Sequence, residues 1–252
     1  MNAEPTIAFH FPPLCDRYRP VCEAIIESLF PDGRTGRIPL AIITGSGDCV
    51  GAGRWLAALL REPGRKAGRA SCEGLYLDHE RLKPGDQASL AGSLAALLCP
   101  EVDIAVLERD LASVRHQGLG LDRVDALILT RLAGDAGAGL AAELEQAARV
   151  LVAATHPKGV VVVEANDPTA AAIAESFAGT VAAVYLRGDQ VIMATRDGAE
   201  QVLALDERAV SAATGSGHVS GLLTAVATAW AMGVPADAIA MRIASAIRDG
   251  EV

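Results

Sequence analysis

The sequence contains few aromatic side chains, no long apolar run and no basic residue at its start. Of its 252 residues, 4% are Phe, Trp or Tyr although 51% are hydrophobic, so we expect a core of Ala, Val and Leu. No apolar run reaches the ~20 residues that a membrane-spanning helix needs. The opening Asn2-Ala-Glu-Pro is polar and lacks the Lys or Arg of a signal peptide. We therefore expect a cytoplasmic protein without a membrane partner.

The cysteines and the charge balance exclude further classes. The five cysteines are scattered and form no CxxC pair, which argues against a disulfide framework and against a zinc site. The formal net charge is −9, and an acidic chain is poorly suited to nonspecific binding of nucleic acid. A chain of this length can form one α/β domain, or one domain with a short appendage.

A glycine-rich turn near residue 45 lies between an apolar run and an amphipathic segment. Residues 40–43 predict a buried strand, residues 45–53 a turn, and the residues after them a helix. This is the layout of a phosphate-binding loop, whose backbone amides attract an anion. Such a loop also needs a lysine and a hydroxyl. Those positions hold Cys49 and Val50, and Asp48 lies where a phosphate would approach.

Strand and helix patterns alternate up to residue 177. Further strands are predicted at residues 6–11, 70–77, 103–107, 126–130 and 159–163, and helices at 20–30, 87–98, 140–154 and 168–177. Short strands at 181–186, 191–195 and 201–205, with hairpin-type turns, precede helices at 218–232 and 235–247. The predicted fold is α/β: a mostly parallel sheet with helices on both faces, plus short antiparallel strands near the C-terminal part.

Ligands of such sheets bind at the carboxyl ends of the strands. Gly45 to Gly51, Glu108, Arg131 and Glu164 are expected along that edge. The sequence contains no internal repeat and no long linker. We therefore expect a single domain over residues 1–252, in which residues 1–36 form a lead-in strand and helix and residues 37–252 form the core.

Short stretches spread over nearly the whole chain match one family in order. Gly36-Arg-Ile-Pro precedes the loop, and Glu73-Gly-Leu-Tyr-Leu-Asp and Pro100-Glu-Val-Asp-Ile-Ala-Val-Leu-Glu follow it. Glu164-Ala-Asn-Asp-Pro and Trp230-Ala-Met-Gly-Val-Pro-Ala-Asp-Ala-Ile come later. Together they resemble the central ATP-binding domain of the Mur ligases, and most closely that of cyanophycin synthetase. The resemblance implies a domain in which ATP phosphorylates a carboxylate and an amine attacks the acyl phosphate to form an amide.

The resemblance allows the family's functional positions to be compared one at a time. The family's loop reads TGTNGKTT, and Thr44-Gly-Ser-Gly-Asp-Cys-Val-Gly departs from it most severely at Cys49, where the lysine is lost. Loss of one such charged contact costs ~10²-fold or more in rate. The metal-binding glutamate is retained as Glu108. The histidine of the family's His-Asn-x-x-Asn motif is retained as His218, but both asparagines are replaced.

These comparisons define the candidate site that the resemblance implies. The candidate nucleotide-binding residues are Thr44, Gly45, Ser46, Gly47, Asp48 and Cys49 in the loop remnant, together with Asp167 and His218, and the candidate metal ligand is Glu108. No catalytic residue is assigned, and ATP and Mg²⁺ are expected only if the nucleotide site is still used. The family's C-terminal domain is expected to be absent, because the sequence stops at Val252.

Three hypotheses of function follow. The first, which we favour, is an inactive relative that acts as a noncatalytic binding or assembly module, as a homodimer or in a complex with another protein. The second is an ATP-binding amide ligase or ATPase that works with a partner subunit. The third is a cysteine-based activity at Cys49, whose thiol at a helix N-terminus could be reactive. The alternative interpretation of Cys49 is a small residue that fills the place of the lost lysine.

Two charged groups also leave alternatives open. Glu108 could bind a metal, or it could form an ion pair with Arg109 or Arg131. In addition, four arginines could bind an acidic ligand in place of ATP, or they could lie on solvated faces and form local salt bridges. These arginines are Arg109, Arg115, Arg123 and Arg131.

Overall fold

The structure is a computed structural model that describes residues 20–21, 23–25, 27–28, 36–132, 138–205, 208–209, 211 and 219–252. The chain divides into two compact units, residues 1–37 and residues 38–252. The described residues of the first unit, before residue 36, are helical and fall within the helix predicted at residues 20–30. The strand predicted at residues 6–11 lies outside the described residues.

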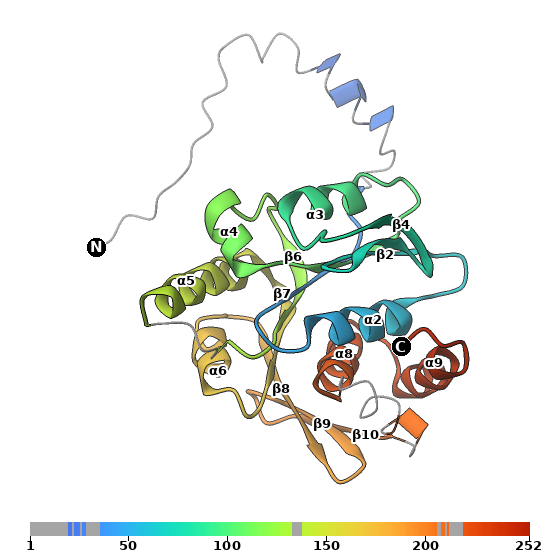
Figure 1. Ribbon diagram of the computed structural model, residues 1–252, viewed down its shortest axis with the longest axis vertical. Coiled ribbons are helices and arrows are strands. Elements are labelled where there is room, and N and C mark those ends of the chain that lie inside the picture. The colour runs from blue at the N-terminus through green and yellow to red at the C-terminus, as the bar shows by residue number, and fades with distance from the viewer. Residues whose placement is uncertain are drawn as a thin grey trace. The chain divides into compact units, whose positions relative to one another are not determined.

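A ten-stranded sheet forms the centre of the second unit (Figure 1). Its strands are β1 Leu40–Thr44, β2 Ala67–Ser71, β3 Gly74–Leu77, β4 Glu80–Pro84, β5 Ile104–Glu108, β6 Val124–Leu129, β7 Thr155–Glu164, β8 Thr180–Arg187, β9 Gln190–Thr195 and β10 Glu200–Ala204. The strand order is β10-β9-β8-β7-β6-β1-β5-β2-β3-β4. The strands from β8 to β2 pair in parallel, whereas β9–β10 and β3–β4 extend the two edges as antiparallel pairs. The predicted α/β class is confirmed.

Helices cover both faces of the sheet, as Figure 1 shows. They are α2 Cys49–Leu60, α3 Leu90–Leu97, α4 Leu111–Gln117, α5 Ala138–Ala154, α6 Pro168–Ala174, α8 Val219–Ala231 and α9 Ala236–Arg248. Helices α2, α8 and α9 pack on one face, and α3 to α6 pack on the other. Because successive strand residues point to opposite faces, Ala41 and Ile43 join the first core, and Leu40 and Ile42 join the second.

The edge beside β5 corrects the sequence prediction. The strand predicted at residues 70–77 is two antiparallel strands, β2 and β3, and β4 was not predicted. The backbones of β3 and β4 approach each other closely. A Cβ atom on Gly74 would lie 2.5 Å from the Lys83 carbonyl oxygen, so the position requires glycine. The short helix α4 was also not predicted. It begins after Asp110, whose side chain accepts a hydrogen bond from the Ser113 amide.

Two helices begin at positions that differ from the predicted ones, because capping residues set where they start. The helix predicted at residues 87–98 begins at Leu90, because Ser89 caps it by accepting a hydrogen bond from the Gly92 amide. Pro235 was predicted at the first helical position, and it occupies the N-cap position of α9 instead. No helix among the described residues is long and apolar enough to cross a membrane.

Candidate functional site

The glycine-rich loop connects β1 to α2 and packs against the end of β6. Gly45 has a φ of +128°, and a Cβ atom there would lie 2.4 Å from Thr130 Oγ1, so only glycine fits. The amide and the hydroxyl of Ser46 both donate to the Arg131 carbonyl oxygen, each at 2.7 Å. The Gly47 amide donates to Thr130 Oγ1 at 3.2 Å. The loop is therefore bonded to the neighbouring strand end, as expected for the carboxyl edge of a parallel sheet.

The first turn of α2 uses its own groups as hydrogen-bond partners. The Asp48 carboxylate accepts a hydrogen bond from the Gly51 amide at 2.8 Å, and the Cys49 amide donates to the Gly47 carbonyl oxygen at 2.9 Å. Helix α8 lies close above this turn, because a Cβ atom on Gly221 would lie 2.3 Å from Asp48 Oδ2. A carboxylate thus occupies the positive end of the helix, where a phosphate loop receives its anion.

Cys49 is packed beneath the loop. Its Sγ lies 3.4 Å from Thr130 Oγ1 and 3.6 Å from the Gly45 carbonyl oxygen. Burial raises the pKa of the thiol to about 12, together with smaller contributions from the Glu108 and Asp48 carboxylates and against the lowering effect of the Thr130 hydrogen bond. A thiolate is the reactive form of cysteine, so this environment supports the space-filling interpretation of Cys49 and disfavours a reactive thiol.

Glu108 ends β5 and is only 4% exposed. Its Oε2 accepts a hydrogen bond from the Cys72 amide at 3.1 Å, whereas its buried Oε1 has no hydrogen-bond partner. Arg69 Nη1 lies 4.0 Å from Oε1, so the ion-pair partner is Arg69 rather than the predicted Arg109 or Arg131. Burial raises the pKa of Glu108 to about 7, although the Cys72 amide and Arg69 oppose the rise.

The environment of Glu108 fits one ligand position of a metal ion. A buried carboxylate oxygen without a hydrogen-bond partner is a suitable ligand for Mg²⁺, which proteins usually bind through one or two carboxylates together with phosphate oxygens and water. Among the described residues, no group of three or more His, Cys, Asp or Glu side chains is placed to hold a metal by itself. Any magnesium at Glu108 would therefore depend on ligands that a nucleotide and water supply.

The two remaining candidate residues are Asp167, which caps a helix, and His218. Asp167 caps α6 by accepting hydrogen bonds from the Thr169 and Ala170 amides at 3.0 Å, and its other oxygen accepts from the Leu132 amide at 2.8 Å. Both of its oxygens thus have backbone partners. His218 lies outside the described residues.

The four arginines considered as an anion site make separate contacts. Arg109 is buried and donates to the carbonyl oxygens that follow α4, at Gly118 and Leu119. Arg115 pairs with Glu143 and Arg123 pairs with Asp125, each at 2.9 Å, while Arg131 is exposed. The interpretation as structural contacts and local salt bridges fits this arrangement better than a common anion site.

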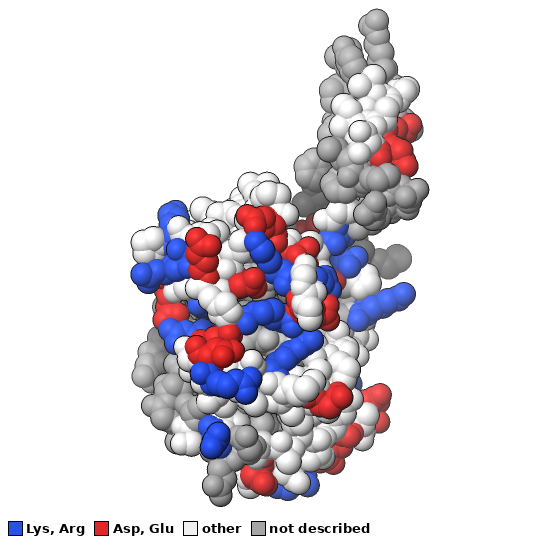
Figure 2. Space-filling view, turned by 90° about the vertical axis from the view of Figure 1, so that its right-hand side faces the viewer, with Lys and Arg blue, Asp and Glu red and all other residues white. Residues whose placement is uncertain are grey.

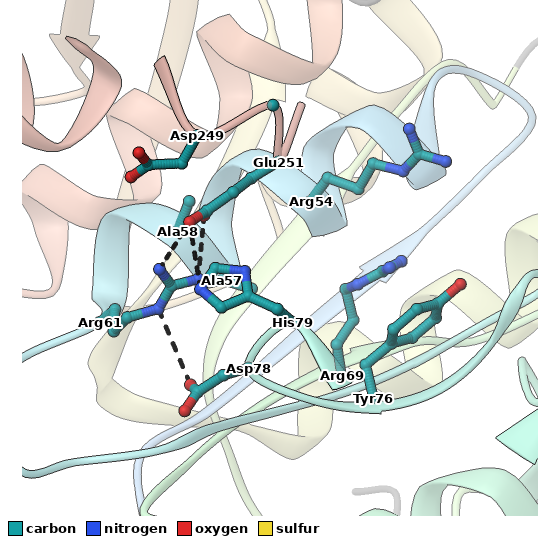
Figure 3. A pocket seen from close by; sticks show the side chains of 11 residues that line it. Arg54, Ala57, Ala58, Arg61, Arg69, Tyr76, Asp78, His79, Asp249 and Glu251 are labelled. Carbon is teal, nitrogen blue, oxygen red and sulfur yellow. Dashed lines mark hydrogen bonds and ion pairs between the residues drawn. The ribbon is translucent and has the colours of Figure 1, made fainter. Parts of the chain in front are cut away.

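A polar pocket of 520 Å³ lies next to this region and contains none of the predicted loop residues (Figure 3). We call it the α2–α9 pocket, because α2, strands β2 and β3, the turn after β3 and the segment after α9 line it. Arg69 connects it to Glu108. Sequence patterns could not find it, since its walls come from distant segments. Over this side of the second unit, Lys and Arg side chains lie next to Asp and Glu side chains (Figure 2).

Comparison with known proteins gives the relationship of the chain. Cyanophycin synthetase of Crocosphaera subtropica is 31% identical over 197 residues, and that of Synechocystis sp. is 29% identical over 197 residues. Each alignment covers 77% of this chain. Among solved structures, a UDP-N-acetylmuramoyl-L-alanyl-D-glutamate–2,6-diaminopimelate ligase superposes with a TM-score of 0.58 over 88% of this chain and 48% of that chain, at 13% identity. The chain contains a Mur ligase-like central domain.

Two further structures share the fold of this Mur ligase-like domain. Escherichia coli FolC, solved in complex with DHPP and ADP, has a TM-score of 0.56 at 20% identity, over 83% of this chain and 57% of that chain. A bifunctional folylpolyglutamate synthase/dihydrofolate synthase, solved with Mn, AMPPNP and L-glutamate, also has a TM-score of 0.56, at 16% identity, over 90% of this chain and 61% of that chain. The chain spans 23% of the length of the two cyanophycin synthetases. No protein-family model matches it.

Proposed function

We propose that this Mur ligase-like domain has lost ATP-dependent amide ligation and acts as a noncatalytic binding or assembly module. The observation that carries the proposal is the hydrogen bond from the Gly51 amide to the Asp48 carboxylate at the start of α2. This carboxylate would repel a phosphate at the place where the loop amides and helix dipole should attract one. The amides of Ser46, Gly47 and Cys49 are also used within the protein.

The lost lysine supports the same proposal. Cys49 occupies the position that the family gives to lysine, and its buried thiol supplies no positive charge to a transferring phosphoryl group. We propose that the module works in the cytoplasm, as a homodimer or bound to another protein. A strictly monomeric species in native mass spectrometry would contradict the homodimer form.

Calorimetry of nucleotide binding tests the proposal. The chain is titrated with ATP and with ADP in excess Mg²⁺, and no binding is expected at millimolar nucleotide. A triple variant, Asp48→Gly, Cys49→Lys and Val50→Thr, removes the internal anion and restores the lysine and hydroxyl of the family's loop, so it is expected to gain binding. Cys49→Lys alone is the matched control, because it keeps the Asp48 cap. Binding to the unaltered chain tighter than about 100 μM, or about 5.5 kcal/mol, would contradict the proposal.

The second candidate function is an ATP-binding amide ligase or ATPase that acts with a partner subunit. Glu108 favours it, since the carboxylate is retained, buried and has one oxygen without a hydrogen-bond partner. The relatives named cyanophycin synthetase, and the related structures solved with ADP or with Mn and AMPPNP, are consistent with it. It predicts Mg²⁺-dependent nucleotide binding that Glu108→Ala abolishes and that the exposed control Glu101→Ala leaves unchanged.

A further inference from the structure

The α2–α9 pocket already holds a carboxylate, and this carboxylate comes from the chain itself. Glu251 follows α9, yet its side chain is only 10% exposed. Both of its oxygens accept hydrogen bonds from the Arg61 guanidinium, each at 3.0 Å, and His79 Nε2 lies 3.1 Å from Oε1 (Figure 3). Paired hydrogen bonds from one guanidinium to one carboxylate are the usual way in which proteins recognise carboxylates.

The end of α9 places Glu251 there. Gly250 has a φ of +68°, which ends the helix in the left-handed conformation that glycine adopts without strain. The Glu251 amide then donates to the Ala246 carbonyl oxygen at 3.0 Å, and the Gly250 amide donates to the Ile247 carbonyl oxygen at 3.3 Å. These two bonds form a Schellman motif. The motif holds the backbone of Glu251 at the position from which its side chain reaches Arg61 and His79.

The pocket has room for more than this one side chain. Its volume of 520 Å³ is present with Glu251 inside and falls within the range of roughly 300–1,000 Å³ that small-molecule sites occupy. Arg54 and Arg69 line the wall on the side away from Arg61, and the Arg69 guanidinium lies 4.0 Å from the centre of the Tyr76 ring (Figure 3). Both guanidinium groups also contact Glu73, because Arg54 donates hydrogen bonds to it and Arg69 Nη1 lies 3.6 Å from its Oε2, so a second negative charge on the ligand would share these two arginines with Glu73.

We propose that the α2–α9 pocket is a binding site for a small dicarboxylate, and that Glu251 is its internal competitor. One carboxylate of the ligand takes the place of Glu251 on Arg61 and His79, and the other faces Arg54 and Arg69. An attached competitor acts at an effective concentration in the millimolar range, so the unaltered chain binds such a ligand weakly. The proposal does not depend on the state of the phosphate loop, because none of the loop residues lines the pocket.

Glutarate is the probe, since it is a five-carbon dicarboxylate with the carbon skeleton of free glutamate. Its binding is measured by calorimetry without nucleotide for the unaltered chain, for Glu251→Ala and for Glu62→Ala. Glu62 is the matched control, because it is an exposed acid whose contact with Arg65 lies outside the pocket. Glu251→Ala is expected to bind glutarate at least tenfold more tightly than either the unaltered chain or Glu62→Ala.

Two further variants secure the interpretation. Adding Arg61→Met to Glu251→Ala is expected to abolish the gain, because the guanidinium that receives the carboxylate is lost. Glu251→Gln keeps the shape of the side chain, and thermal unfolding checks that the variant is folded. It is expected to raise the affinity for glutarate by a smaller factor than Glu251→Ala does. Equal binding by Glu251→Ala, Glu251→Gln and Glu62→Ala would overturn the proposal. So would tight binding that survives the loss of Arg61.

Discussion

Asp48 Oδ1 lies 2.8 Å from the amide nitrogen of Gly51, and this hydrogen bond closes the first turn of α2. The same carboxylate lies against Gly221 of α8, where there is no room for a side chain. Asp48 is therefore part of the packing between the helices α2 and α8. Its removal has consequences for stability as well as for anion binding.

Asp48→Ala is expected to lower the free energy of unfolding by about 1 kcal/mol, the typical cost of losing an N-cap side chain. Asp48→Asn keeps an acceptor for the Gly51 amide and is expected to have a smaller effect. Urea denaturation measures both. Asp110→Ala, which removes the corresponding cap of α4, gives a reference for the same chemistry elsewhere. An Asp48→Ala protein as stable as the unaltered chain would show that the cap does not contribute.

Gly45→Ala is expected to destabilise the fold by about 3 kcal/mol or more, because overpacking adds to backbone strain. The new Cβ atom would lie 2.4 Å from Thr130 Oγ1 and 2.6 Å from the Thr130 carbonyl oxygen. Gly64→Ala is the matched control, since Gly64 has a φ of +80° and open space around it. Gly64→Ala introduces backbone strain without a clash, so it is expected to lower the free energy of unfolding by about 1–2 kcal/mol. Equal losses in the two variants would refute the close packing of the loop against Thr130.

Cys49 is expected to resist alkylation at pH 8. With a pKa raised to about 12 by burial, about one molecule in 10⁴ carries the thiolate at that pH. Cys72 is exposed, so iodoacetamide should modify it at least tenfold faster, as peptide mapping by mass spectrometry would show. Denatured protein, in which both thiols react at similar rates, is the control. Faster labelling of Cys49 than of Cys72 would restore the hypothesis of a cysteine-based activity.

The raised pKa of Glu108 predicts a pH-dependent stability in the metal-free protein. Burial raises this pKa from 4.5 to about 7, so the folded protein binds more protons than the unfolded chain between these values. The contribution of Glu108 to the free energy of unfolding is therefore complete below pH 4.5 and is lost as the pH rises through about 7. Glu108→Gln cannot titrate at this position. Relative to this variant, the free energy of unfolding of the unaltered chain is expected to fall by about 3 kcal/mol between pH 4.5 and pH 8.

Urea denaturation of both proteins at several pH values across this range measures the loss, and the difference between them cancels the other titrating groups. Glu108→Gln also keeps an acceptor for the Cys72 amide, so the comparison isolates the charge. A constant difference between the two proteins would mean that Glu108 has an ordinary pKa in the folded state.

Local patterns predicted most of the elements. The parallel strands are continuous apolar runs because both of their faces are buried, and the residues that end them, such as Glu108, follow from where each run stops. The presence of Asp48 and Cys49 in the loop could likewise be interpreted from the sequence, since the chemistry of a phosphate loop depends on adjacent residues. The sequence alone determined the α/β class, the position of the loop and the identity of its residues, which include no lysine.

Only the tertiary structure decided which distant groups meet. Strand β4 escaped prediction because it is exposed at the sheet edge and lacks a buried face, and β2 and β3 were predicted as one strand. Glu108 pairs with Arg69 rather than with its neighbour Arg109, which turns into the other core layer to reach the end of α4. Arg61 and Glu251, separated by 190 positions, meet only because α9 packs beside α2. Apolar burial drives that packing without direction or sequence range, so no local pattern of residues could reveal the pocket that it creates.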